Sequence, residues 1–202
     1  MFRSGFIAII GRPNVGKSTF FNAIIGDKIS IVTAKPQTTR NRITGIKNLP
    51  DAQMIFLDTP GMHRAKTPLN RAMVQAARET MGDADLLLVI VDCTGRSDEE
   101  ERFVQETIAG AGSPVFLAIN KIDRLEKPLL LPMIDRLSRM HDFAGIFPIS
   151  ALKKEGLDTL VTCLKEALPE GPRLFPDDMA TDASERFIAE EFIRGRITVL
   201  TS

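Results

Sequence analysis

GRPNVGKS, the stretch from Gly11 to Ser18, carries two glycines, a lysine and a serine in the spacing G-x-x-x-x-G-K-S. The apolar run GFIAII (5–10) before it is typical of a buried strand, and KSTFFNAII (17–25) after it predicts a helix that Gly26 ends. A glycine-containing turn between a strand and a helix lets consecutive backbone N–H groups and the helix dipole surround a polyphosphate. The stretch therefore predicts a site for the phosphates of a nucleotide.

The rest of the chain continues as alternating strands and helices. The runs ITGIKNL (43–49) and AQMIFLD (52–58) are rich in strand formers and meet at Pro50-Asp51, which predicts a hairpin. The further elements expected are a helix from Thr67 to about Met81, a strand at 85–92, a helix opened by the capping pair Ser97 and Glu100, a strand at 114–120, a helix at 128–140, a strand at 144–149 and a helix at 155–168. This alternation predicts an α/β domain with a mostly parallel sheet of six strands and helices on both faces.

The composition is that of an ordinary globular chain. Of 202 residues, 26 are Lys or Arg and 26 are Asp or Glu, so the formal net charge is zero, which argues against a chain that coats nucleic acid or anionic lipid. Two cysteines, Cys93 and Cys163, cannot form a disulfide framework. The longest apolar runs have about six residues, too few for a membrane span or a signal peptide. We expect a cytoplasmic protein, with peripheral contact with the cytoplasmic membrane left open.

The last 34 residues differ in character from the chain before them. PEGPRLFPDDMATD (169–182) contains three prolines and predicts a linker. SERFIAEEFIRGRITVLTS (184–202) has the pattern of a helix passing into a strand, which cannot bury its apolar faces alone. The sequence therefore predicts a first domain at 1–168, a linker at 169–183 and the start of an incomplete second domain at 184–202.

Two motifs supply groups for phosphate and metal. In the first, Lys17 can reach the β- and γ-phosphates and the hydroxyl of Ser18 can bind Mg²⁺. In the second, DTPG (58–61), Asp58 can hold a water bound to Mg²⁺ and the N–H of Gly61 can contact a γ-phosphate. The segment after Gly61 is then a natural sensor of the nucleotide state.

Two further motifs supply groups for a purine base. In NKID (120–123), Asn120 can brace the phosphate-binding loop, and Asp123 can accept hydrogen bonds from N1–H and the 2-amino group of guanine, which adenine does not offer. In SAL (150–152), the N–H of Ala151 can be offered to guanine O6. All four motifs follow predicted strands, at the edge where open α/β sheets bind ligands, so together they predict one guanine nucleotide site.

The four motifs, in this order, resemble those of the GTPase superclass of P-loop NTPases over about residues 5–168. The finer resemblance is to the Era family of bacterial ribosome-assembly GTPases, in the TrmE-Era-EngA-like superfamily. It rests on GRPNVGKST (11–19), KPQTTRNRITG (35–45), DTPGMH (58–63), NKID (120–123) and SERFIAEEFIRGRI (184–197). The resemblance implies a Ras-like GTPase domain followed by a KH-type RNA-binding domain, cut here after its first elements.

In that family the KH domain engages the 3′ end of small-subunit ribosomal RNA during assembly of the small ribosomal subunit. The 202 residues contain no G-x-x-G, the loop that clamps nucleotides in a KH domain. The resemblance therefore implies RNA binding for an intact protein rather than for this chain.

The resemblance implies GTP or GDP and Mg²⁺ as ligands. The residues expected to bind the nucleotide are Gly11, Arg12, Pro13, Asn14, Val15, Gly16, Lys17, Ser18, Thr19, Asp58, Thr59, Pro60, Gly61, Met62, Asn120, Lys121, Ile122, Asp123, Ser150, Ala151 and Leu152. The residues expected to hold Mg²⁺ are Ser18, Thr39 and, through water, Asp58, and those expected to serve catalysis are Lys17, Thr39 and Gly61. The segment TTR favours Thr39 as the switch hydroxyl over Thr38 and Thr33.

Met62 stands where familiar small GTPases carry a Gln that orients the attacking water. Intrinsic hydrolysis is therefore expected to be slow, on the order of 10⁻⁴–10⁻³ s⁻¹. In GTPases that resemble this chain, an Asn at the position of Asn14 helps to bind a potassium ion in place of an arginine finger, so we expect K⁺ to stimulate hydrolysis. His63 is expected to be an exposed loop residue without a catalytic role.

Three alternatives to this interpretation remain open from the sequence. An ATP-using kinase or ATPase shares the loop at 11–18, although NKID (120–123) argues against it. A GTPase module of a tRNA-modifying or transporter protein of the same potassium-linked group would differ after Ser184. A non-catalytic RNA- or ribosome-interaction module would bind the nucleotide without releasing phosphate.

Overall fold

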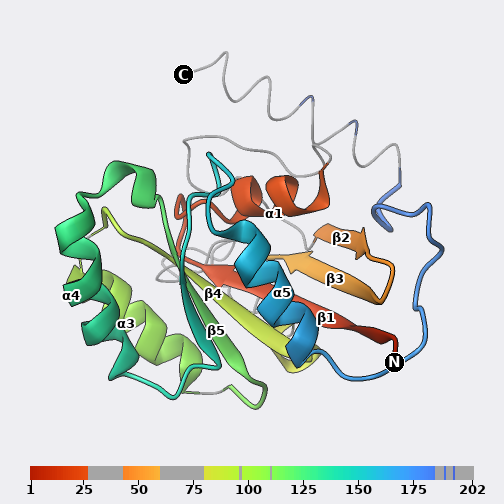
Figure 1. Cartoon of the computed structure of the whole chain (residues 1–202), viewed down its shortest axis with the longest axis horizontal. Helices are drawn as coiled ribbons and strands as arrows, with labels where there is room; N and C mark the ends of the chain where they lie inside the picture. Colours follow the sequence, from red (N-terminus) through yellow and green to blue (C-terminus); the bar gives the residue numbers. More distant parts are fainter. Residues whose placement is uncertain are drawn as a thin grey trace, which may run out of the picture.

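The computed structural model describes residues 1–26, 43–59, 80–95, 97–109 and 111–184, together with Ala189 and Ile193. Its elements, labelled as in Figure 1, are β1 (Arg3–Gly11), α1 (Lys17–Ile25), β2 (Ile43–Asn48), β3 (Ala52–Asp58), β4 (Leu86–Asp92), α3 (Ser97–Ile108), β5 (Val115–Asn120), a 3₁₀ turn η1 (Ile122–Arg124), α4 (Lys127–Ser138), β6 (Gly145–Pro148) and α5 (Leu157–Ala167). These bounds confirm the expected elements to within about two residues. The helix expected at 67–81 lies mostly outside the described residues, of which 80–82 are helical.

The six strands form one sheet in the order β2-β3-β1-β4-β5-β6. The pairs β1–β3, β1–β4, β4–β5 and β5–β6 are parallel, and the hairpin pair β2–β3 is antiparallel, as the sequence predicts. Because neighbouring parallel strands end at the same edge, β1, β3 and β5 bring Gly11, Asp58 and Asn120 to that edge. The topology therefore gathers the motifs at the edge where the nucleotide site is expected.

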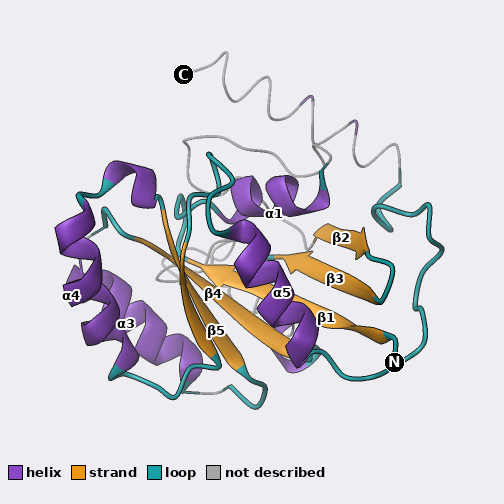
Figure 2. Ribbon diagram, viewed as in Figure 1, coloured by secondary structure: helices purple, strands orange, loops and turns teal. Residues whose placement is uncertain are grey.

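Helices cover both faces of the sheet. Helices α1 and α5 cover one face, and α3 and α4 cover the other (Figures 1 and 2). Ile7 and Ile9 of β1 pack on the first face, whereas Ala8 and Ile10 pack on the second. Strands covered on both faces are mostly apolar, and all seven residues of β3 are buried, including the polar residues Gln53 and Asp58.

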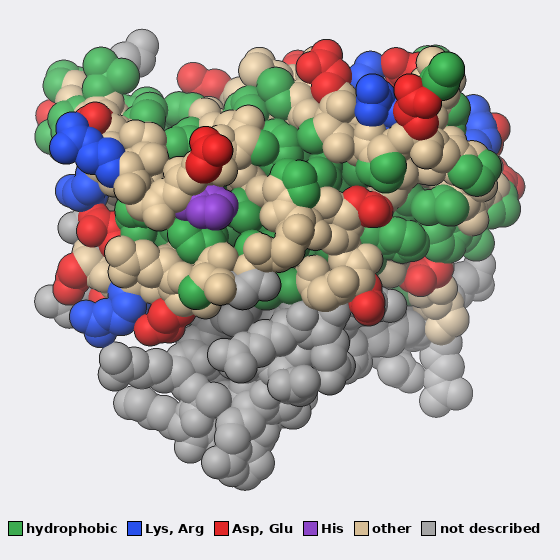
Figure 3. All heavy atoms as spheres, turned by 90° about the horizontal axis from the view of Figure 1, so that it is seen from below, with side chains coloured by type: hydrophobic (Ala, Val, Ile, Leu, Met, Phe, Trp, Pro, Cys, Tyr) green, Lys and Arg blue, Asp and Glu red, His purple; other side chains and the backbone are tan. Residues whose placement is uncertain are grey.

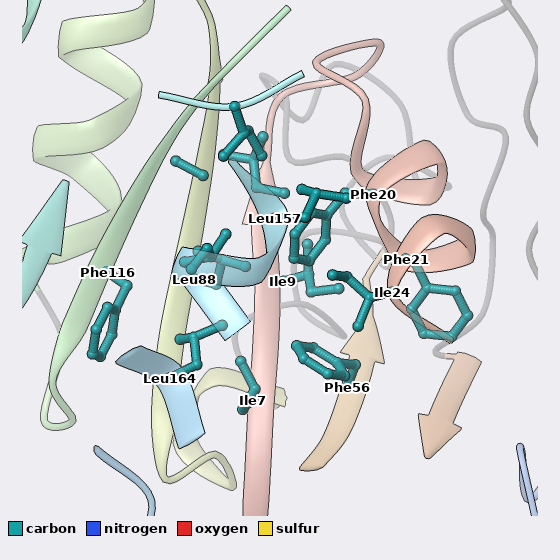
Figure 4. Packing of buried hydrophobic residues seen from close by; sticks show 14 of the residues in the cluster. Ile7, Ile9, Phe20, Phe21, Ile24, Phe56, Leu88, Phe116, Leu157 and Leu164 are labelled. Carbon is teal, nitrogen blue, oxygen red and sulfur yellow. The ribbon is translucent and has the colours of Figure 1, made fainter. Parts of the chain in front are cut away.

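Aromatic packing fixes helix α1 on the sheet. Phe20 of α1 meets Phe56 of β3 edge-on, with ring centroids 6.2 Å apart (Figure 4). Gly26 ends the helix in the left-handed conformation, with φ of 92°, and its N–H donates to the carbonyl of Asn22. The first turn of α1, which carries Lys17, is thereby held over the end of the sheet.

Residues 169–184, which we call the C-terminal strap, lie along the sheet (Figure 1, blue segment). The N–H of Ser4 donates to the carbonyl of Pro169 at 3.1 Å, and the N–H of Ile46 donates to the carbonyl of Ala180 at 2.8 Å. The stretch expected to be a linker is thus packed against β1 and β2, and its role between two domains stays a prediction.

Gln53 of β3 binds the middle of the C-terminal strap. Its side chain is fully buried, its Oε1 accepts the N–H groups of Leu174 and Phe175 at 2.7 and 2.9 Å, and its Nε2 donates to the Phe175 carbonyl at 2.8 Å. A buried side-chain amide therefore replaces water for three backbone groups of the strap. No helix within the described part of the chain is long and apolar enough to cross a membrane.

Candidate functional site

The turn between β1 and α1 has the backbone form of an anion site. Asn14 and Gly16 adopt positive φ angles of 64° and 100°, and left-handed residues of this kind turn successive N–H groups toward one concave side. The carbonyl of Asn14 accepts the Nζ of Lys121 at 2.6 Å, and that of Val15 accepts the Nδ2 of Asn120 at 2.8 Å. Side chains from the NKID segment therefore hold the outer carbonyls of the phosphate-binding loop.

Lys17 lies inside this loop. Its Nζ donates to the carbonyls of Gly11 and Arg12 at 3.0 and 2.9 Å, and the residue is 7% exposed. Burial lowers the pKa of Lys17 to about 8, while the negative charges of Asp58 and Glu100 act in the opposite direction. A buried ammonium with two weak carbonyl partners is placed to gain a stronger anionic one.

Ser18 and Asp58 bring two oxygen atoms together. The Ser18 hydroxyl donates to Oδ2 of Asp58 at 3.1 Å, and Asp58 is fully buried at the end of β3. A hydroxyl and a carboxylate are the hard oxygen ligands that Mg²⁺ takes beside substrate phosphates, so the residues present fit the ion. Thr59 follows, with its hydroxyl fixed on the carbonyl of Ile9 at 2.7 Å.

Asn120 joins three of the four motifs. While its Nδ2 donates to Val15, its Oδ1 accepts the N–H of Ala151 at 3.0 Å. A Cβ atom on Gly16 would lie 2.3 Å from Nδ2, so only glycine leaves room for this brace. The predicted bracing role of Asn120 fits this geometry, and the N–H of Ala151, expected to reach guanine O6, donates here to Asn120.

Asp123 is held by a hydroxyl from the SAL segment. Ser150 donates its hydroxyl to Oδ1 of Asp123 at 2.6 Å, and this hydrogen bond is the main reason why the pKa of Asp123 is lowered. The carboxylate therefore stays ionised and has one oxygen fixed. An ionised carboxylate in this state can accept two N–H donors from one edge of a base.

Lys121 connects the base motif to the next strand. Besides the Asn14 carbonyl, its Nζ contacts Oδ2 of Asp92 at 2.5 Å, and Asp92 ends strand β4. The stem of Lys121 thus crosses from the end of β5 to the phosphate-binding loop, where it can cover the face of a bound base.

Some of the remaining predicted residues are described by the structure, and the others lie outside the described part of the chain. Val15 is 2% exposed and packs in the core, so it offers only its backbone, whereas Leu152 is 69% exposed. Ile122 opens the 3₁₀ turn η1. The predicted residues outside the described part of the chain are Thr33, Thr38, Thr39, Pro60, Gly61, Met62 and His63.

The structure adds Glu99 and Glu100 to the site, a role that the sequence did not indicate. The guanidinium of Arg12 donates to Glu99 at 2.5 Å and to Glu100 at 2.9 Å, both on α3. These glutamates raise the pKa of Arg12, although its burial acts to lower it, and burial raises the pKa of Glu100 against the effect of Arg12. The sequence suggested only a capping role for Glu100, because nothing local relates it to a residue 88 positions away.

Comparison with known proteins gives a consistent result. Residues 6–121 match the family described as 50S ribosome-binding GTPase. The chain is 54% identical over 201 residues to the GTPase Era of Syntrophus aciditrophicus (strain SB), covering 100% of this chain and 66% of that protein. It is 50% identical over 200 residues to the GTPase Era of Geobacter metallireducens, covering 99% of this chain and 67% of that protein.

Two solved structures are similar over nearly the whole chain. An Era in complex with MgGDPNP and nucleotides 1506–1542 of 16S ribosomal RNA aligns with a TM-score of 0.90 and 41% identity, covering 97% of this chain and 67% of that one. An Aquifex aeolicus Era variant bound to GDP·AlF₄⁻ aligns with a TM-score of 0.94 and 42% identity, covering 100% of this chain and 69% of that one. The chain thus spans about two thirds of the length of the relatives that it matches.

Proposed function

This chain belongs to the Era family of GTPases, and we propose that it binds GTP and hydrolyses it slowly to GDP and phosphate as a molecular switch. One observation carries the proposal. Asn120 links Val15 of the phosphate-binding loop to Ala151 of the base motif, so the groups for a triphosphate and for guanine belong to one site. The ATPase and kinase alternatives lack support, because Asp123 at this site offers a carboxylate that adenine cannot pair with.

The phosphates are bound by the turn at 11–16 and by Lys17. Backbone N–H groups and the N-terminus of α1 stabilise the negative charge, and the Nζ of Lys17 leaves two carbonyls for phosphate oxygens. Ser18 and, through a water molecule, Asp58 would hold Mg²⁺, which when bound neutralises charge on the β- and γ-phosphates. The chemistry is positioning and charge stabilisation rather than covalent catalysis.

The base is selected by Asp123. Its ionised carboxylate accepts N1–H and the 2-amino group of guanine, and Ser150 fixes its orientation. Beside adenine the same carboxylate would be desolvated without donors, which disfavours ATP.

The switch and catalytic residues are assigned by similarity to the family. Thr39 is the proposed hydroxyl that reaches Mg²⁺ when a γ-phosphate is present, and the N–H of Gly61 is the proposed contact with that phosphate. Met62 cannot orient water, so turnover without a helper should be on the order of 10⁻⁴–10⁻³ s⁻¹.

We also propose potassium as a second cation. The support is Asn14, an exposed residue of the phosphate-binding loop with a positive φ. A potassium ion there would supply the positive charge that an arginine finger provides elsewhere.

The intact protein is proposed to act on the small ribosomal subunit. One relative of known structure holds nucleotides 1506–1542 of 16S ribosomal RNA, and we propose this 3′ end as the partner of a complete protein with domains at 1–168 and from 184 onward, joined through 169–183. On the face shown in Figure 3, Lys and Arg side chains lie in small groups among acidic ones. A ribosomal partner implies a cytoplasmic location. Flotation with lipid vesicles would test whether the protein also contacts the membrane peripherally.

A competition experiment tests the proposal. The chain should bind GTP and GDP but not ATP, and should release phosphate only from GTP. Since it has no Trp and no Tyr, bound guanine nucleotide should dominate its ultraviolet spectrum. Binding without phosphate release under any condition would favour the non-catalytic interaction module instead.

A further inference from the structure

Arg12 of the phosphate-binding loop is held by helix α3. Its Nη2 lies 2.5 Å from Oε2 of Glu99 and its Nη1 lies 2.9 Å from Oε1 of Glu100, in the first turn of that helix. Each carboxylate therefore takes a different nitrogen of one guanidinium, an arrangement that fixes the direction of the side chain.

The ordinary role of acidic residues at a helix start does not explain Glu100. Negative charges there stabilise the helix dipole, and exposed Asp98 can do so without burial. Glu100 is only 3% exposed, and burying a carboxylate is costly unless a cation pairs with it. The position of Glu100 is therefore explained by Arg12 rather than by the helix end.

The turn before α3 leaves room for this carboxylate. A Cβ atom on Gly95 would lie 3.1 Å from Oε1 of Glu100 and 3.2 Å from the carbonyl of Asp92. Any side chain at position 95 would crowd the carboxylate that binds Arg12.

Arg12 transmits this contact to the phosphate site. Its side chain is bound by α3, and its own carbonyl is one of the two that hold the Nζ of Lys17. Arg12 is also a residue of the turn at 11–16, so a shift of α3 relative to the loop would move the backbone that surrounds the phosphates.

We propose that Glu100, assisted by Glu99, is a positioning residue for guanine nucleotide binding, which acts by holding Arg12 and thereby couples helix α3 to the phosphate-binding loop. The proposal rests on the proposed function, because it assigns these glutamates to the same nucleotide site. It gives α3 a direct influence on the rate at which nucleotide leaves.

The test measures the binding of a fluorescent GDP analogue to the whole 202-residue chain by stopped flow. Glu100→Gln and Arg12→Gln should each raise Kd by about tenfold, mainly through faster dissociation, and the double variant should be little weaker than either single one. The matched control is Glu101→Gln, because Glu101 is on the same helix but pairs with Arg136 of α4, and its Kd should equal that of the wild type.

Three results would overturn the proposal. The first is that Glu100→Gln has the same Kd as the wild type. The second is that the increases in Kd of the two single variants multiply in the double variant. The third is that Glu101→Gln loses as much affinity as Glu100→Gln. If Glu100→Gln does not fold, Glu99→Gln decides, because its side chain is 40% exposed, and it should raise Kd by about threefold. Failure of the wild type to bind GDP would instead reject the proposed function.

Discussion

The side-chain amide of Asn120 donates a 2.8 Å hydrogen bond to the carbonyl of Val15, across 105 positions of sequence. Together with the hydrogen bond from Lys121 to the carbonyl of Asn14, this contact holds the proposed phosphate-binding loop against the segment proposed to bind the base. Both residues are almost completely buried, so water cannot take over the contact if it is broken.

Replacing Asn120 should therefore damage both stability and binding. Asn120→Ala leaves the Val15 carbonyl and the Ala151 N–H without their partner, which should lower the free energy of unfolding by about 2–4 kcal/mol and weaken GDP binding at least about tenfold. Urea denaturation and titration with a fluorescent GDP analogue measure the two effects. Asn120→Asp keeps the acceptor for Ala151 but removes the donor to Val15, so wild-type affinity in this variant would contradict the importance of the Val15 contact.

Asp123 should set the preference for guanine. Asp123→Asn loses the ionised acceptor of N1–H and the 2-amino group, so GTP affinity should fall by about a hundredfold or more. Inosine triphosphate lacks the 2-amino group, so competition between it and GTP isolates the contact of Asp123 with that group. The wild type should prefer GTP over inosine triphosphate, and Asp123→Asn should not. Ser150→Ala removes only the hydrogen bond that fixes Asp123 and should weaken GTP binding by about three- to tenfold. If Asp123→Asn still preferred GTP over inosine triphosphate, a group other than Asp123 would have to recognise the base.

The arrangement of the motif residues at one edge of the sheet could be predicted because each motif is a short segment that follows a strand. The glycines at 11 and 16, Lys17 and Ser18 have fixed spacing on one turn, and Asp58 and Asn120 end apolar strands whose edge is set by the parallel sheet. Local spacing and strand direction were sufficient for these residues. The confirmed six-stranded sheet follows from the same alternation.

Contacts that depend on the orientation of distant surfaces could not be predicted. Glu100 meets Arg12 only because α3 starts beside the phosphate-binding loop, and its sequence neighbours favoured a capping role. Gln53 interrupts the apolar run AQMIFLD, and nothing in its sequence neighbourhood shows that it is fully buried against the C-terminal strap. The prolines of the strap predicted a linker, and sequence alone does not show that its backbone groups have partners on the sheet.

The pKa of Lys17 predicts a pH dependence of nucleotide binding. Without nucleotide, burial places this pKa at about 8, and an anionic phosphate has to raise it by favouring the ammonium. Binding should therefore be accompanied by proton uptake above pH 8. Affinity should be constant below about pH 8 and should fall with rising pH, approaching about tenfold for each pH unit.

Calorimetry in buffers of different ionisation enthalpy measures this proton uptake directly. At about pH 9 the uptake on binding GDP should approach one proton, and at about pH 7 it should be close to zero. An affinity that does not change between these pH values would show that Lys17 is already fully charged in the free protein.

Gln53 should stabilise the C-terminal strap. Gln53→Leu removes the partners of the Leu174 N–H and of both backbone groups of Phe175, so the free energy of unfolding should fall by about 2–3 kcal/mol. Hydrogen exchange of residues 172–181 should accelerate in the same variant. Gln105→Leu, at an exposed position of α3, is the matched control and should change neither quantity. Unchanged exchange in Gln53→Leu would mean that other contacts are sufficient to hold the strap.

Potassium dependence can be separated from the conformation of the loop at Asn14. The residue has a φ of 64°, a conformation that glycine adopts without strain, so Asn14→Gly removes the amide while it preserves the backbone. If the amide helps to hold K⁺ beside the transferred phosphate, the wild type should hydrolyse GTP at least about tenfold faster in KCl than in NaCl of equal concentration. Asn14→Gly should lower the rate in KCl to the rate in NaCl. Equal wild-type rates in the two salts would reject a role for potassium, whereas a potassium effect that persists in Asn14→Gly would place the ion on other groups of the loop.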